Sequence, residues 1–202
     1  MKNREHIAIA IMSSLLATSG FAANPFLDAK DDKPVSANFR GTEWNDENIQ
    51  GEIPLTARVL TARIAQMSWG AIFKIEFVDL KSRAKERREI PPLYFIVTDE
   101  RIVLLNEENN GAAVKKMSAM DKPPAFEEGD IHGITSGTLK HEEGPWKTTI
   151  ELKGDECIYL TSHDSGHFGE FVWKRGAGLV EHSSGYGAMK DGFRLKRATS
   201  KK

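Results

Sequence analysis

Alternation of apolar and polar residues predicts that this chain is built mainly of β-strands. Phe73, Ile75 and Phe77 alternate with Lys74 and Glu76, and a period of two is typical of a strand with one face in the core. The preceding segment, 58–67, is rich in valine, leucine and isoleucine. It is interpreted as another strand because these side chains favour a pleated, half-buried surface.

Two apolar runs around residue 100 predict a β-hairpin. The runs 93–97 and 102–105 flank a polar turn that begins at Thr98. Both runs are apolar on both faces, which indicates strands inside the sheet rather than at a solvated edge.

The C-terminal third of the chain predicts an antiparallel meander. Short strands with glycines between them are expected at 148–152, 156–163, 167–173, 179–184 and 193–196. The sequence shows no convincing long helix. It therefore predicts a mainly β fold with little helix, in which an antiparallel meander curls into a sandwich or partial barrel.

Two polar segments set the expected organisation of the chain. Residues 23–52 are polar and turn-rich, so they are interpreted as a leader into a single β-rich domain over 53–202. The segment 106–130 has a short helix-compatible stretch around 112–120. A connection of this length often carries function, and its role is left open.

The N-terminus predicts a cleaved export signal. Lys2 and Arg4 precede an uncharged run over 7–17 that is too short to cross a bilayer as a helix. Gly20 and Ala22 fit the cleavage rule for small residues, so residues 1–22 are expected to be a signal peptide and Ala23 the mature N-terminus. We therefore expect an exported protein, periplasmic or secreted, without a transmembrane segment after processing.

Charge and cysteine content narrow the possible partners. The chain has 28 basic and 29 acidic residues, and this balance argues against nucleic-acid binding. Cys157 is the only cysteine, so an intramolecular disulfide is impossible. Because Cys157 opens an apolar run, we expect it to be a small buried side chain. No motif indicates a cofactor.

The segment 163–167 is a candidate metal site. If the three residues between His163 and His167 form a tight loop with Gly166 in the left-handed conformation, the two imidazoles face each other across the hairpin. Two histidines and the carboxylate of Asp164 are possible zinc ligands. The alternative is a solvated turn with ordinary histidines.

A third histidine ligand is not expected at this hairpin. If Trp173 pairs with Leu179, then His182 pairs with Glu170. Glu170 and His167 are three residues apart, so their side chains point to opposite faces of the strand. His182 is therefore expected to point away from the hairpin.

A basic cluster between two predicted strands is a candidate site for an anionic partner, such as an acidic glycan, a lipid head group or an acidic protein patch. Its members are Lys81, Arg83, Lys85, Arg87 and Arg88. The alternative is a solvated connection, stabilised by a pair of opposite charges four residues apart.

No catalytic motif emerges, so the sequence favours an exported, non-enzymatic binding domain. Its expected partner is an envelope or extracellular protein, a glycan or a small apolar ligand. One alternative is a metal-assisted hydrolase that uses His163, Asp164 and His167. Another is a carrier of hydrophobic ligands with an open interior lined by Phe73, Ile75, Phe77, Phe95 and Tyr159.

Overall fold

The computed structural model describes residues 24–27, 33–45, 51–84, 88–105, 110–187 and 191–199. The predicted signal peptide, 1–22, lies outside the described residues. Along the described chain, no helix is long and apolar enough to cross a membrane.

The described residues form twelve strands, which pair into one antiparallel sheet. The strands are β1 Val35–Trp44, β2 Ile53–Met67, β3 Gly70–Ser82, β4 Leu93–Val97, β5 Arg101–Leu104, β6 Ile131–Ile134, β7 Thr138–Glu143, β8 Trp146–Lys153, β9 Glu156–His163, β10 His167–Lys174, β11 Gly178–Tyr186 and β12 Asp191–Arg197. Their order in the sheet is β6-β5-β4-β3-β2-β1-β12-β11-β10-β9-β8-β7. The mainly β prediction is confirmed, as is the hairpin of β4 and β5.

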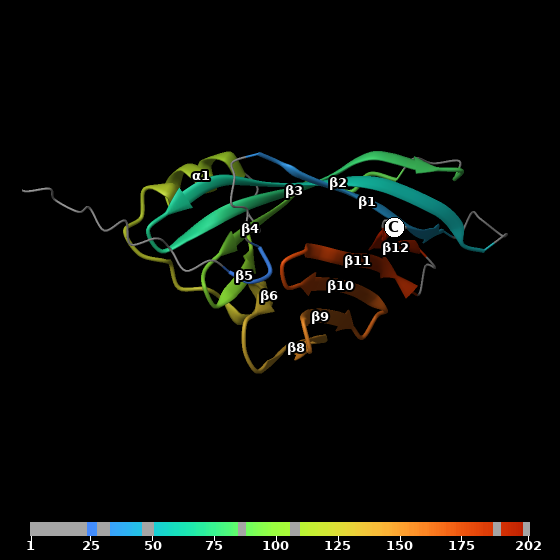
Figure 1. The fold of residues 1–202 in the computed structure, drawn as a ribbon. Coiled ribbons are helices and arrows are strands. Elements are labelled where there is room, and N and C mark those ends of the chain that lie inside the picture. Colours follow the sequence, from blue (N-terminus) through green and yellow to red (C-terminus); the bar gives the residue numbers. More distant parts are fainter. Residues whose placement is uncertain are drawn as a thin grey trace, which may run out of the picture.

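The sheet curls into a nearly closed, barrel-like shape (Figure 1). β6 is one edge of the sheet, yet it contacts β8 and β9 near the other edge. The indole Nε1–H of Trp173 on β10 donates to the carbonyl oxygen of His132 on β6 at 2.9 Å. This buried hydrogen bond ties the two ends of the sheet together.

Large side chains fill the middle of the curled sheet. The ring centroid of Phe95 lies 5.2 Å from that of Trp173 and 5.9 Å from that of Phe171, both in edge-to-face arrangements. Ile75 and Leu195 are completely buried beside them in the same core. The centre is thus a packed core.

One helix, α1 Asn110–Ser118, packs on the outer side of the sheet near β2 (Figure 1). Ala113 and Met117 are buried in this contact. Just after the helix, the carbonyl of Met120 accepts a hydrogen bond from the indole of Trp69 at 2.8 Å. The helix-compatible stretch in the long connection is therefore a helix that covers the sheet.

The segment interpreted as a polar leader contains β1, which lies in the middle of the sheet, so that interpretation is wrong for 35–44. β1 pairs with β2 on one side and with β12 on the other. Its inward face carries few apolar side chains, with Phe39 fully buried and Glu43 buried in an ion pair. The hydrophobic pattern was therefore too weak to reveal the strand.

Arg88 is a partly buried cross-link, with a side chain that is 20% exposed. Its Nε lies 3.1 Å from the Glu43 carboxylate, and its Nη2 also bonds to Asp191. The guanidinium lies over the ring of Phe193, 5.6 Å from the centroid. Arg88 thus fastens the connection before β4 to β1 and β12, and its charge is paired within the chain.

The structure describes two of the other members of the predicted patch. Lys81 and Arg83 are exposed, whereas Lys85 and Arg87 lie outside the described residues.

The predicted burial of Cys157 is confirmed, because its side chain is fully buried on β9. Its Sγ accepts a hydrogen bond from the backbone N–H of Ile134 at 3.4 Å, and burial raises the pKa of the thiol. The thiolate is the reactive form, so we expect no labelling by a maleimide in the native state and full labelling after denaturation. Intact mass before and after denaturation measures this, and rapid native labelling would contradict it.

Candidate ligand cavity

The predicted histidine hairpin is present between β9 and β10. Gly166 has a φ of 102°, and its N–H donates to the carbonyl of His163 at 2.8 Å. Ser165 Oγ lies 2.6 Å from His163 Nδ1 and 3.0 Å from His167 Nδ1. A serine hydroxyl therefore bridges the two imidazoles.

Asp164 does not join these histidines. Its carboxylate lies 3.4 Å from the ammonium of Lys147 and is solvent-exposed. No group of three or more histidine, cysteine or acidic side chains suited to hold a metal ion occurs among the described residues. The hairpin thus brings together two of the three predicted ligands.

The face assigned to His182 from the sequence is wrong. Trp173 does pair with Leu179, but a register shift between Val172 and Trp173 places His182 opposite Phe171 instead of Glu170. A β-bulge adds one residue to one strand, and this reverses the faces of all residues beyond it. His182 therefore faces the interior, as His167 does.

His167 and His182 line a cavity of about 590 Å³, here called the histidine cavity. Four histidines come from four different strands: His132 on β6, His141 on β7, His167 on β10 and His182 on β11. The wall also includes five aromatic residues, which are Trp146, Tyr159, Phe168, Phe171 and Phe193. The curl of the sheet thus gathers rings that are far apart along the chain.

His132 forms part of the inner wall of this cavity. Its ring stacks on Tyr159 at a centroid distance of 4.0 Å and meets the edge of Phe171 at 4.8 Å. Only 5% of the residue is exposed, and its buried Nδ1 has no hydrogen-bond partner among the described residues. Burial, with a smaller contribution from His182, lowers the pKa of His132 to about 3. The ring is therefore neutral at pH 7.

His182 is the second buried imidazole. Its Nδ1 donates to the backbone carbonyl of Glu170 at 3.0 Å, which leaves Nε2 with the lone pair. The ring stacks on Phe171 at 4.2 Å. Burial lowers the pKa of His182 to about 4, opposed in part by the hydrogen bond to Glu170. This imidazole is also neutral at pH 7.

Three hydroxyl groups add polarity to the wall between β8 and β9. Thr148 Oγ1 and Thr161 Oγ1 lie 2.8 Å apart on paired strands. Burial raises the pKa of the Tyr159 phenol, although hydrogen bonds with these two threonines oppose the shift. The inner cavity therefore offers neutral hydrogen-bonding groups beside aromatic faces.

The outer part of the cavity is acidic and aromatic. Glu143, at the end of β7, pairs in register with Trp146, which is 40% exposed at the start of β8. Asp130 lies in the 3-10 helix Glu128–Asp130 that packs against β7. His141 Nε2 lies 3.7 Å from the Glu143 carboxylate. This outer opening of the cavity, here called the mouth, is thus formed by the carboxylates of Asp130 and Glu143 beside the accessible indole of Trp146.

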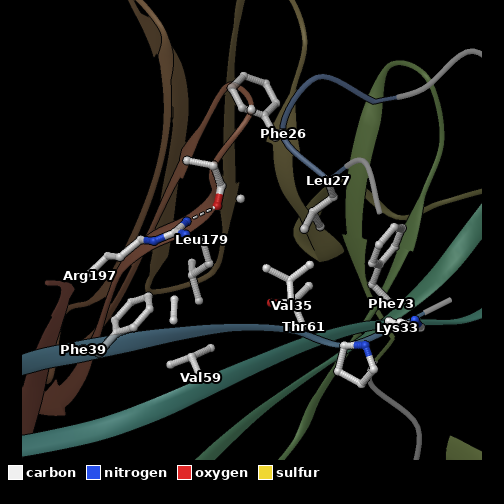
Figure 2. Close-up of a pocket in the computed structure, with 15 residues that line it drawn as sticks. Phe26, Leu27, Lys33, Val35, Phe39, Val59, Thr61, Phe73, Leu179 and Arg197 are labelled. Atoms are coloured by element: carbon white, nitrogen blue, oxygen red, sulfur yellow. Dashed lines mark hydrogen bonds between the residues drawn. The ribbon is translucent and has the colours of Figure 1, made fainter. Parts of the chain in front are cut away.

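A second cavity of about 550 Å³ includes Phe26, Leu27, Phe39 and Leu179 in its wall. Figure 2 shows Phe26 and Leu27 on one side and the strands β1 and β2 on the other, with the Arg197 guanidinium bonded to the Ala177 carbonyl. Leu27 and Lys33 flank residues 28–32, which lie outside the described chain. For this reason we assign no site to this cavity.

The five side chains expected to line a carrier interior do not line one common cavity. Phe73 lines the second cavity, whereas Tyr159 lines the histidine cavity. Ile75 and Phe95 are fully buried and line neither cavity, and Phe77 lines a third. Within the described residues, these five side chains therefore do not enclose one common lumen.

Two histidines of the cavity, His132 and His141, were not identified as candidate site residues from the sequence. His132 lies in the apolar run 131–134, and the alternation of Leu139, His141 and Glu143 is the signal of a strand with one inward face. These runs predict strands, but they do not predict which other strands they approach.

The scan against protein-family models found no matching family, and no curated protein matches the sequence.

Proposed function

We propose that this protein is an exported, non-enzymatic binding domain that holds a small amphipathic ligand in the histidine cavity. The observation that carries the proposal is the cavity itself. Its volume of about 590 Å³ falls in the range of small-molecule sites, which are mostly apolar with a few polar groups that orient the ligand. Export follows from the N-terminal sequence, and the ligand is one met in the envelope or outside the cell.

The chemistry of the wall supports binding of a ring or a short apolar chain. Tyr159, Phe171 and Trp146 offer aromatic faces, and aromatic contacts add to the free energy of burial. The imidazoles and hydroxyls of the inner wall can orient polar atoms of the ligand by hydrogen bonds.

A cavity-filling substitution tests this proposal. Thr161 lies on the inner wall, so Thr161→Phe is expected to occupy the space of the ligand and to weaken binding at least about tenfold, or about 1.4 kcal/mol. The probe is N-phenyl-1-naphthylamine, a neutral apolar amine whose fluorescence rises in a dry site. Fluorescence titration of the mature wild-type protein should show saturable binding with one probe per chain.

Ser162→Phe is the matched control, because Ser162 is the next residue of β9 and is exposed. It adds the same ring on the opposite face of the sheet and should leave binding unchanged. Equal binding by the two variants, or no saturable binding by the wild type, would contradict the proposal.

A further inference from the structure

The charges around the histidine cavity are of one sign. Its described lining includes three carboxylates, Glu89, Asp130 and Glu143, and no lysine or arginine. Arg88 lies next to this wall, but its charge is paired with Glu43 and Asp191. A ligand entering the cavity therefore meets a negative potential.

The carboxylates at the mouth lack a strong cationic partner within the described chain. Burial raises the pKa of Asp130, and the negative charges of Glu127 and Glu143 raise it further. The contacts of the nearby His141 are long, 3.5 Å to Glu128 and 3.7 Å to Glu143. A positive charge placed here would relieve the repulsion among the carboxylates.

The indole of Trp146 offers a second kind of cation-binding surface beside these acids. Its ring centroid lies 4.7 Å from that of His163, and part of the ring is accessible at the mouth. The ring centroid of His167 lies 6.3 Å from that of Trp146, and His167 stacks on Tyr186 at 4.0 Å. A cation over the face of a tryptophan is attracted by its π electrons, most strongly where water is partly excluded.

The inner end of the cavity is suited to the uncharged part of such a ligand. His132 is 5% exposed, lines the wall, and has no hydrogen-bond partner at Nδ1 among the described residues. Both buried imidazoles are neutral at pH 7 because burial lowers the pKa of each. They therefore do not repel a cation held at the mouth.

We infer that the ligand of the histidine cavity is an organic cation, an amine or quaternary ammonium on an apolar body, whose charge lies between Trp146 and the carboxylates of Asp130 and Glu143. The inference rests on the proposed function. The apolar body extends inward towards Tyr159 and Phe171, and the ammonium group remains near the mouth.

The test compares three ligands of similar size that differ in charge. Benzyltrimethylammonium is the cation, neopentylbenzene is its neutral isostere and phenylacetate is an anion. Each competes with N-phenyl-1-naphthylamine at pH 8 and low salt. We expect the cation to displace the probe at a concentration at least about tenfold lower than the neutral isostere, and the anion to be the weakest competitor.

The outcomes separate this inference from the proposed function. If the probe itself fails to bind saturably, the proposed function fails. If the probe binds but the cation competes no better than its neutral isostere, the cavity is a binding site and the inferred charge preference is wrong.

Two variants test whether the preference for a cationic ligand arises from the residues at the mouth. Glu143→Gln should reduce the affinity for the cation about fivefold and leave that for the neutral isostere unchanged, and Trp146→Leu should also lower the preference. The Glu143 side chain is 82% exposed, so the fold is expected to tolerate this change. Glu142→Gln removes the same charge from the outward face of β7 and should have little effect. Equal effects of the two glutamate substitutions would overturn the assignment.

Discussion

The free energy of unfolding is expected to fall by about 4 kcal/mol when the pH is lowered from 7 to 5, with about half from each of His132 and His182. Burial lowers the pKa of these imidazoles to about 3 and about 4, whereas an unfolded histidine has an ordinary value of about 6.5. Between these values, the unfolded chain binds two protons that the folded chain excludes. The stability is therefore complete above about pH 6.5 and is lost as the pH falls towards the folded values.

Urea denaturation at the two pH values measures this effect. His132→Phe should remove about half of the pH dependence, because phenylalanine keeps a ring against Tyr159 and does not titrate. It should not destabilise the protein strongly at pH 7, since it also removes a buried nitrogen without a partner. His163→Ala is the control on the exposed hairpin and should keep the full dependence. An unchanged pH dependence in His132→Phe would contradict the buried, neutral state of this residue.

Trp173→Ala is expected to lower the free energy of unfolding by about 3–5 kcal/mol, the range for a large buried aromatic side chain. Trp173 is completely buried and packs on both Phe95 and Phe171. Its indole also bonds to the carbonyl of His132, across the two ends of the sheet. The variant thus creates a cavity in the core and opens the closure of the sheet.

Trp173→Phe separates the contribution of the ring packing from that of the hydrogen bond to His132. It keeps most of the ring packing but leaves the His132 carbonyl without its donor, so a loss of about 1–3 kcal/mol is expected. Trp146→Ala truncates the same side chain at an exposed site and should cost less than about 1 kcal/mol. Chemical denaturation of the three variants measures the differences. Equal losses for Trp173→Ala and Trp146→Ala would show that Trp173 does not contribute to closure.

Local patterns were enough to predict the strands of the C-terminal meander and the burial of Cys157. Hydrophobic alternation indicates which face of a strand is buried, and a glycine between two strand-like runs indicates a tight turn. Gly166 is such a glycine, and in the structure it has a positive φ. Both signals depend on residues that are neighbours along the chain. The sequence by itself therefore determined the mainly β class and the opposed histidines of the hairpin.

The sequence could not predict interactions between residues that are far apart along the chain. Glu43 is buried in contact with Ser82 and with Arg88, which come 39 and 45 residues later, so β1 carries a polar pattern that conceals a central strand. The face of His182 depends on a bulge beyond Val172 that leaves no trace in the hydrophobic period. A one-residue difference in register reverses which face is buried.

The histidine cavity was decided by the tertiary structure alone. His132 and Tyr159 stack although they lie on β6 and β9, which are not neighbours in the sheet order. Their approach depends on how far the sheet twists and curls before its two edges meet, and many small contacts determine that together. The sequence specifies each strand, but the space enclosed between strands arises only when all of them have packed.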